Sequence, residues 1–147
     1  MHLISQIKLE CKLIHDKARM PFRIRPTDAG YDLSSIEDVV VHPNAIINVR
    51  TGVILVAPAG YYLSVEGRSS LWSKGILPFS GIIDGGYTGE LMIAITNVSN
   101  DPYKISCGDR IAQVIVHKIE DCYIDLVEDI SPEYNIRSTL GYGSSGR

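Results

Sequence analysis

The chain has 147 residues, of which 14 are basic and 17 are acidic, and its formal net charge is −3. This length predicts one domain with a sizeable core. The mild acidity argues against stable nucleic-acid binding, although a few convergent cations can still neutralise one triphosphate. No apolar run approaches the roughly 20 residues that cross a bilayer, and the start lacks the zones of a secretion signal, so we expect an intracellular protein, cytoplasmic or nucleoplasmic, without a membrane partner.

Short runs rich in Val, Ile, Tyr and Thr, separated by turn residues, predict an all-β fold. In chain order these runs are VVVHP, AIINVRTGVILVAPAG with Gly52 near its middle, YYLSVEG, LMIAITNVSND and DRIAQVIVHKI. Many short strands at this spacing indicate a sandwich, barrel or jelly roll rather than alternating βαβ units. The turns are expected at 59–60, 84–86, 99–102 and 107–109.

One segment, RSSLWSKG, predicts a short helix, with hydroxyl groups that can cap its start and Gly75 as its stop. Arg68 with Ser69 and Ser70 at a helix start also makes a plausible anion site. A plain helix cap beside a surface arginine is the simpler alternative.

The segment GIIDGGYTGEL places Asp84 after two apolar residues and before two glycines. A carboxylate at the end of a buried strand is partly desolvated, which raises its proton affinity and makes it a better general base. The alternative is that Asp84 is a turn residue that caps its own hairpin, and the residue spacing alone favours this alternative. By default, Tyr87 is likewise interpreted as a half-buried aromatic residue of a strand.

Two other motifs place polar residues among apolar ones. AGYDL contains Asp32, which either lies near a magnesium ion or makes a structural hydrogen bond. GDRIAQ presents Asp109, Arg110 and Gln113 at a strand start, and a turn before a half-buried strand is the favoured interpretation.

The three cysteines and four histidines show no spacing typical of a metal site. We interpret the cysteines as small core residues with free thiols, which fits a reducing compartment. The cysteines are Cys11, Cys107 and Cys122.

From Ser131 onward the chain reads SPEYNIRSTLGYGSSGR, without a periodic apolar face. Such a tail is ordinarily disordered, yet its composition also suits a phosphate clamp. Arg137 supplies charge, Ser144 and Ser145 supply donors, and glycines allow close backbone approach. Tyr142 offers a flat face for a base. We therefore predict a β-domain over 1–130 and a C-terminal arm over 131–147.

The motifs AGYDL, GRSSL, GIIDGGYTGEL, GDRIAQ and RSTLGYGSSG occur in one order and resemble the five motifs of the homotrimeric dUTPases. The resemblance covers the chain from about Ala29 to its end. It implies a jelly-roll-like distorted β-barrel with one short helix and a flexible C-terminal arm. It also implies a homotrimer with shared active sites. In that family each site takes its first, second and fourth motifs from one subunit, its third from another and its arm from the remaining one.

The activity implied by the resemblance is Mg²⁺-assisted hydrolysis of dUTP to dUMP and pyrophosphate, which limits uracil incorporation into DNA and supplies dUMP for dTMP synthesis. Asp84 would be the general base for the water that attacks the α-phosphorus, and Asp32 would orient the magnesium ion through water. Tyr87 would stack on the deoxyribose and exclude a 2′-hydroxyl. The other substrate-binding residues would be the phosphate ligands Arg68, Ser69, Ser70 and Gln113, the uracil-reading hairpin positions Gly81, Ile82, Ile83 and Met92, and the arm residues Arg137, Tyr142, Gly143, Ser144 and Ser145.

Several positions depart from the family pattern. Gly67 and Ser70 occupy the ends of the second motif, where proline and glycine are usual. Pro78 lacks an N–H on the strand that approaches the hairpin. The remaining departures are Gly85 and Gly86, in place of a more polar pair, and Ser138 and Leu140, in place of glycines.

The related dCTP deaminases are the main alternative, because EGRSSL looks more like their second motif. Those enzymes place a catalytic glutamate in the strand after the third motif, where this chain has Ala94. Alanine cannot shuttle protons, so we reject deamination. A non-catalytic regulatory member is the third class, and nothing in the sequence requires it.

Overall fold

The structure is a computed structural model that describes residues 6–134. Within this range the chain is built from antiparallel strands with one short α-helix, which confirms the all-β prediction. In chain order the elements are β1 (Glu10–Leu13), β2 (Tyr31–Ser34), β3 (Val39–Val41), β4 (Ile46–Arg50), β5 (Val53–Val56), β6 (Tyr61–Glu66), α1 (Ser69–Trp72), β7 (Ile76–Pro78), β8 (Gly81–Ile83), β9 (Met92–Asn97), β10 (Tyr103–Ile105), β11 (Arg110–Lys118) and the 3₁₀ turn η1 (Pro132–Tyr134).

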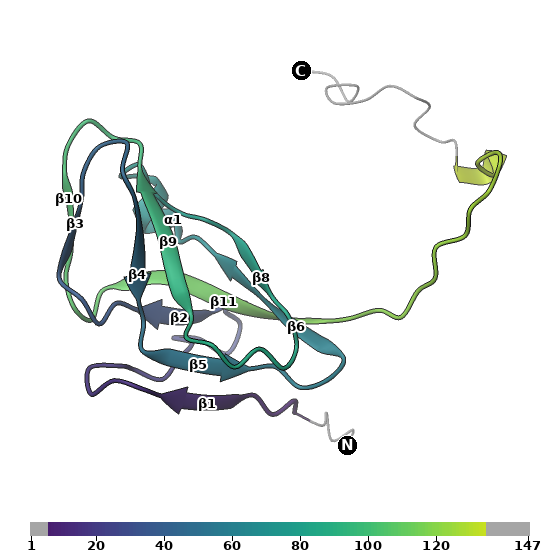
Figure 1. The fold of residues 1–147 in the computed structure, drawn as a ribbon, viewed down its shortest axis with the longest axis horizontal. Helices are drawn as coiled ribbons and strands as arrows, with labels where there is room; N and C mark the ends of the chain where they lie inside the picture. The colour runs from purple at the N-terminus through teal and green to yellow at the C-terminus, as the bar shows by residue number, and fades with distance from the viewer. Residues whose placement is uncertain (1–5, 135–147) are drawn as a thin grey trace.

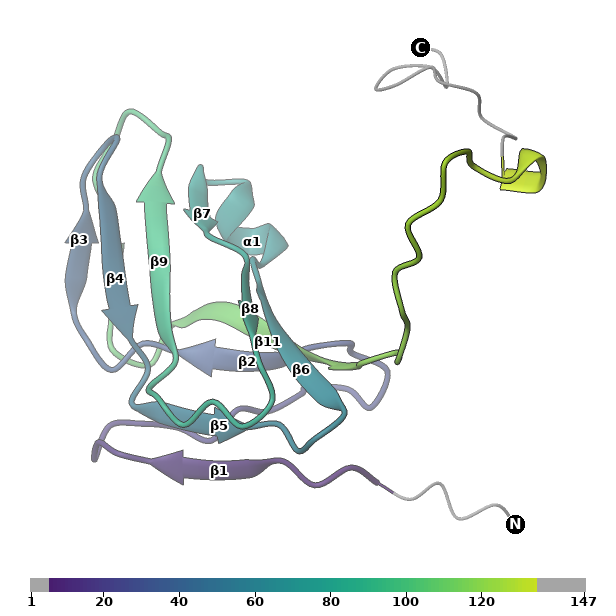
Figure 2. The same ribbon diagram turned by 45° about the vertical axis from the view of Figure 1, so that its right-hand side comes forward.

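The strands form two larger sheets and two two-stranded ribbons. The larger sheets have the orders β2-β11-β6-β8 and β4-β9-β7, and the ribbons are β1-β5 and β3-β10. In Figures 1 and 2 the β4-β9-β7 sheet stands beside the β3-β10 ribbon, while β1, β5 and β2 run across the lower end. The sheets surround a common core without joining into one hydrogen-bonded barrel among the residues described.

The core receives side chains from both larger sheets. Leu33, Val49, Leu63, Ile95 and Val114 are each at most 1% exposed. Burying each of these side chains contributes about 1.5–3 kcal/mol, so the core holds the sheets in fixed relative positions.

The long apolar run after Pro43 forms two strands rather than one. β4 ends at Arg50 and β5 begins at Val53, because Gly52 between them has a φ of 66°. Glycine adopts this left-handed conformation without a steric penalty, so the chain turns here and the two halves join different sheets.

The helix prediction is confirmed, but its capping is not. Arg68 is the N-cap residue and makes no side-chain capping bond, so the predicted hydroxyl cap is wrong. Gly75 ends the segment as predicted, with a φ of 73°. Pro78 is the last residue of β7, which is an edge strand. Within the described part of the chain no further strand pairs with the outer side of β7, so the missing N–H of Pro78 breaks no hydrogen bond there.

The prediction of core cysteines is wrong. Cys11 and Cys122 are exposed and Cys107 is half-buried, and all three are free. Cys11 lies on β1, whose residues are all exposed because this strand pairs only with β5 at the edge of the molecule.

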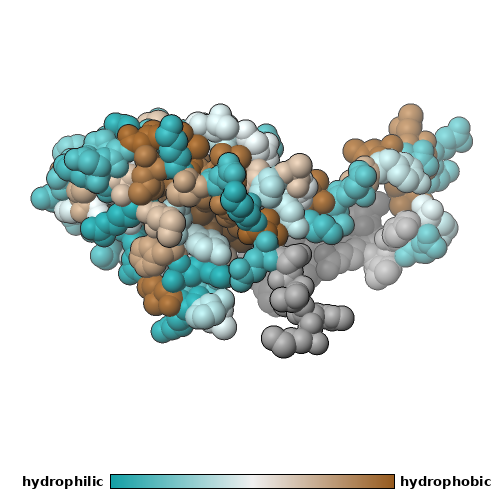
Figure 3. Space-filling model, turned by 90° about the horizontal axis from the view of Figure 1, so that it is seen from below, coloured by the Kyte–Doolittle hydropathy of each residue, from teal (hydrophilic) through white to brown (hydrophobic). Residues whose placement is uncertain are grey.

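After β11 the chain leaves the body of the protein (Figures 1 and 2). Hydrophobic side chains are visible on this projecting segment in Figure 3, and Tyr123, Ile124 and Leu126 are 88%, 98% and 98% exposed. The expected arm residues Arg137, Tyr142, Gly143, Ser144 and Ser145 lie outside the described residues, as do Ser138 and Leu140. None of the helices described is long and apolar enough to span a membrane.

Candidate active site

Three of the sequence motifs meet at one end of the β2-β11-β6-β8 sheet. β11 lies between β2 and β6, and its Gln113 pairs with Asp32 on one side and Glu66 on the other. Arg68 follows β6 directly, at the start of α1. The sheet order therefore brings the first, second and fourth motifs together, although they lie far apart in the sequence.

These residues line a cavity of about 330 Å³, which we call the phosphate cavity. It contains all the residues predicted from those three motifs, namely Asp32, Arg68, Ser69, Ser70 and Gln113, together with Ile24, Asp28, Ala29, Gly30 and Arg110.

Two arginines share one carboxylate in the phosphate cavity. Arg68 Nε lies 3.0 Å from Asp32 Oδ1, and Arg110 Nη1 lies 2.9 Å from Asp32 Oδ2. The Asp32 side chain is only 14% exposed, so solvent screens these pairs incompletely. Within this cluster two guanidinium groups face one carboxylate, and the second carboxylate of the cavity, Asp28, offsets the remaining positive charge. The guanidinium groups still offer planar donors to an anionic ligand.

Gly67, one of the departures from the family pattern, is explained by Trp72. The indole packs against the Gly67 α-carbon, and a Cβ at this position would lie 2.8 Å from Trp72 Cε2. The carbonyl of Gly67 also accepts a 3.0 Å hydrogen bond from Gln113 Nε2. A proline ring at position 67 would collide with the indole, so the glycine and Trp72 form a coupled pair.

The third motif lines a second cavity of about 350 Å³, which we call the hairpin cavity. It lies between β8 and β9 and contains the predicted residues Asp84, Tyr87, Ile82, Ile83 and Met92, together with Glu90 and Leu91. Gly81, also predicted, begins β8.

Asp84 is exposed in the single chain, and Ile82 beside it is 66% exposed. The prediction that this carboxylate ends a buried strand is therefore wrong. β8 is the outer strand of its sheet and pairs only with β6, so nothing within the described chain covers its free side.

The predicted hairpin is wrong, because β8 pairs with β6 and β9 pairs with β4 and β7, so the segment between β8 and β9 is a loop that joins two sheets. This loop is held by backbone contacts with its neighbours. Gly86 N–H donates to the Ala57 carbonyl at 3.1 Å, and Leu91 N–H donates to the Val53 carbonyl at 2.8 Å. A Cβ on Gly85 would lie 2.7 Å from the Tyr61 carbonyl oxygen. Glycine at position 85 is therefore required by this close approach, which explains the first residue of the Gly-Gly departure.

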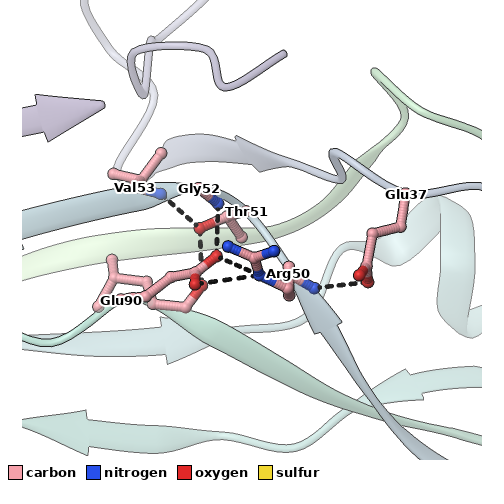
Figure 4. Close-up of polar contacts among 7 residues, drawn as sticks. Glu37, Arg50, Thr51, Gly52, Val53 and Glu90 are labelled. Atoms are coloured by element: carbon pink, nitrogen blue, oxygen red, sulfur yellow. Dashed lines mark hydrogen bonds and ion pairs between the residues drawn. The ribbon is translucent and has the colours of Figure 1, made fainter. Parts of the chain in front are cut away.

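A polar contact that the sequence did not reveal ties this loop to the turn between β4 and β5 (Figure 4). The Glu90 carboxylate accepts a 2.8 Å hydrogen bond from Gly52 N–H and a 3.2 Å bond from Arg50 Nε. Beside it, Thr51 Oγ1 donates to the Leu91 carbonyl at 2.6 Å. Glu90 and its partners are about 40 residues apart in the chain, so no local pattern indicates their contact.

Asp84 and Tyr87 line one cavity, whereas the arginines and Gln113 line the other. One chain thus holds the two parts of the predicted site apart. Ala94 lies on β9 opposite Asn48, so this position supplies no acid or base.

The described residues contain no group of three or more His, Cys, Asp or Glu side chains arranged to hold a metal ion. Asp32 and Asp28 are the carboxylates of the phosphate cavity. Magnesium is commonly held by one or two carboxylates together with substrate phosphates and water, and this donor set fits that mode.

Comparisons with known proteins agree with this geometry. A family model described as dUTPase matches residues 16–146. A deoxyuridine 5′-triphosphate nucleotidohydrolase of Paramecium bursaria Chlorella virus 1 is 39% identical, over 92% of this chain and 95% of the relative. One of a Wolbachia strain from Drosophila simulans is 36% identical, over 97% and 98%.

Solved structures give the same result. A dUTPase variant of Staphylococcus bacteriophage 80alpha with dUpNHpp has a TM-score of 0.86 and 32% identity, over 95% of this chain and 99% of that one. A dUTPase variant from phage phi11 of S. aureus, described with a structural Mg(II) ion, has a TM-score of 0.78 and 31% identity, over 84% and 98%.

Proposed function

The chain belongs to the dUTPase family, and we propose that it is a dUTP diphosphatase in which Asp84 activates the water that attacks the α-phosphorus. The observation that carries this proposal is that two cavities of the chain hold different kinds of side chain. One is lined by two guanidinium groups and two hydroxyls, and the other combines the Asp84 carboxylate with the Tyr87 ring. A nucleoside triphosphate needs both surfaces.

The phosphate cavity suits the triphosphate. The Arg68 guanidinium is a planar donor that matches phosphate oxygens, and the exposed hydroxyls of Ser69 and Ser70 supply two further donors. The Gln113 amide is oriented by its bond to the Gly67 carbonyl. These groups spread the negative charge that develops on the leaving pyrophosphate.

The hairpin cavity suits the deoxyuridine part. Tyr87 N–H donates to the Asp84 carbonyl at 3.2 Å, so the aromatic ring and the carboxylate belong to one tight turn. The ring would stack on the deoxyribose and exclude a 2′-hydroxyl, while backbone groups from Gly81 to Met92 would contact the uracil edge. A narrow slot would also exclude the methyl group of thymine, and discrimination by one such group amounts to about 1–3 kcal/mol.

Asp84 would act as a general base on one water molecule. A carboxylate with free access to solvent can bind that water and accept its proton. The exposure of Asp84 in the single chain is consistent with a base whose environment is completed by other groups.

Magnesium would be held mainly by phosphate oxygens and water, with Asp32 orienting it from the protein side. When bound, it would supply Lewis-acid stabilisation of the charge on the phosphates. The protein contributes the position of the Asp32 carboxylate, which two arginines fix.

A homotrimer with shared sites would bring the two cavities together. The phosphate cavity of one subunit would face the hairpin cavity of a second, and the arm of the remaining subunit, with Arg137, Tyr142, Gly143, Ser144 and Ser145, would close over the nucleotide. Closure would exclude bulk water and align the triphosphate with the attacking water. The separation of the two cavities within one chain supports this assembly.

The proposal is tested by incubating the purified protein with dUTP, UTP, dTTP or dCTP in the presence of Mg²⁺. Pyrophosphate and nucleotide products are then measured. We expect dUMP and pyrophosphate from dUTP, with little product from the other three. Formation of dUTP from dCTP would show a deaminase and overturn the proposal.

Asp84→Asn tests the role of the carboxylate. This variant should lose turnover by several orders of magnitude while it still binds dUTP, because the carboxylate acts on water. Asp101→Asn, at an exposed turn outside both cavities, is the matched control and should behave as the unmodified protein. Near-normal kcat in Asp84→Asn would contradict the assignment of the base.

A further inference from the structure

Arg110 reaches the phosphate cavity because β11 contains a β-bulge. In the pairing of β11 with β2, Gln113 lies opposite Asp32 and Ala112 lies opposite Leu33, but Arg110 lies opposite Ser34. From Ala112 to Arg110 the chain advances two residues on β11, whereas the partner advances only one residue on β2, from Leu33 to Ser34. Ile111 is the extra residue.

The bulge changes the direction of the Arg110 side chain. Strict alternation counted back from Gln113 would point Ile111 toward the cavity and Arg110 toward the core. Instead, Ile111 and Ala112 are both buried, at 1% and 0% exposed, and Arg110 shares the cavity with Gln113. Bulges commonly re-aim a side chain in this way beside functional sites.

Once re-aimed, Arg110 contacts two of the residues proposed to bind substrate or metal. Its guanidinium Nη1 donates to Asp32 Oδ2 at 2.9 Å. Its main-chain carbonyl accepts a 3.1 Å hydrogen bond from Nη1 of Arg68. A single residue thus orients both the carboxylate and the other guanidinium group of the cavity.

We propose that Arg110 is a positioning residue for the phosphate cavity, acting through Asp32. This inference rests on the proposed function and assigns a residue to the same site. The guanidinium of Arg110 occupies one oxygen of Asp32, which leaves Arg68 bonded to the other oxygen only. Without the Arg110 side chain, Arg68 and Asp32 would form a neutral one-to-one pair, with Arg68 less available to a phosphate.

The experiment measures binding of a non-hydrolysable dUTP analogue by calorimetry, with and without Mg²⁺, alongside kcat and KM for dUTP. The variants are Arg110→Met, Arg110→Lys, Asp32→Asn and the double variant Asp32→Asn/Arg110→Met. We expect Arg110→Met to weaken analogue binding by roughly 10- to 100-fold, in line with the loss of a charge-assisted hydrogen bond. The main-chain bond from Arg68 is retained in every variant.

The double variant separates positioning from direct contact. If Arg110 acts through Asp32, the double variant should bind the analogue no more weakly than the weaker single variant, because both changes break one interaction. If the two losses multiply instead, Arg110 contacts the phosphate independently, and the positioning role is overturned.

Arg110→Lys is a milder change that is less prone to misfolding, because it keeps the positive charge. It removes only the planar arrangement of guanidinium donors. It should bind the analogue several-fold more weakly than the unmodified protein, and equal affinity would contradict the inference. Lys118→Met is the matched control. It removes a cation from the far end of the same strand, where Lys118 Nζ lies 3.9 Å from Glu120, and should leave binding unchanged.

The outcomes also separate this inference from the proposed function. If Asp32→Asn weakens binding and Arg110→Met does not, the inference fails while the proposed function stands. If neither change alters binding or turnover, the assignment of the phosphate cavity fails, and the inference fails with it.

Discussion

Replacing Glu90 with alanine should loosen the loop between β8 and β9 that carries Asp84 and Tyr87. Glu90 lies at the end of this loop and binds the turn between β4 and β5 (Figure 4). Its side chain is 15% exposed, and the Gly52 N–H that it accepts is buried. Truncation leaves this N–H without its acceptor.

The magnitude follows from the two contacts. A hydrogen bond to a charged group contributes about 1.5–3 kcal/mol, and the buried Gly52 donor would lose this contribution. The ion pair adds less, about 0.2–1 kcal/mol, because the Arg50 side chain is 40% exposed and solvent screens it. Glu90→Ala should therefore lower the free energy of unfolding by about 2–4 kcal/mol.

Urea unfolding at a fixed protein concentration is the assay, since assembly links stability to concentration. Glu90→Gln keeps an acceptor for Gly52 and should lose only about 1 kcal/mol. Glu10→Ala, in a surface pair with Lys8, is the matched control and should change stability by less than about 0.5 kcal/mol. Equal losses in Glu90→Gln and Glu90→Ala would refute the reasoning, because the buried N–H would then contribute nothing.

Three further predictions concern single contacts in the two cavities. Tyr87→Ala should raise the ratio of UTP to dUTP hydrolysis by about tenfold or more; an unchanged ratio, from steady-state kinetics with both nucleotides, would contradict stacking on the sugar. Gly85→Ala should lower kcat and stability together, because the added Cβ meets the Tyr61 carbonyl oxygen. Urea unfolding and dUTP turnover check this, and full retention of both would show that the close approach is absent. Gly67→Ala should lower dUTP affinity, and a second change, Trp72→Ala, should restore it by removing the indole that the Cβ meets. A double variant that is as weak as the single one would contradict the coupling.

Strands with an apolar run of their own were predictable from sequence, and others were not. The runs that became β6, β9 and β11 carry their own apolar pattern. The sequence does not indicate β1, β2 and β10: β1 is exposed throughout, β2 has only four residues, and β10 has three, of which Ile105 alone is buried. Such strands form because a partner strand distant in the sequence has a free edge, and the residues of the strand itself do not indicate this partner.

The site shows the same limit. The motifs named Asp32, Arg68 and Gln113, and the sheet order brings these residues together. Arg110 stands in the motif GDRIAQ, but simple alternation places its side chain in the core and cannot anticipate the bulge at Ile111. The exposure of Asp84 was mispredicted because two apolar neighbours indicate burial only where another element covers them.

The central claim is that water attacks dUTP at the α-phosphorus, the position to which the proposed site delivers it. A single turnover of dUTP in ¹⁸O-labelled water, followed by mass spectrometry of both products, tests this claim most directly. The account predicts that the label appears in dUMP and is absent from pyrophosphate. Label in pyrophosphate would show attack at the β-phosphorus and contradict it.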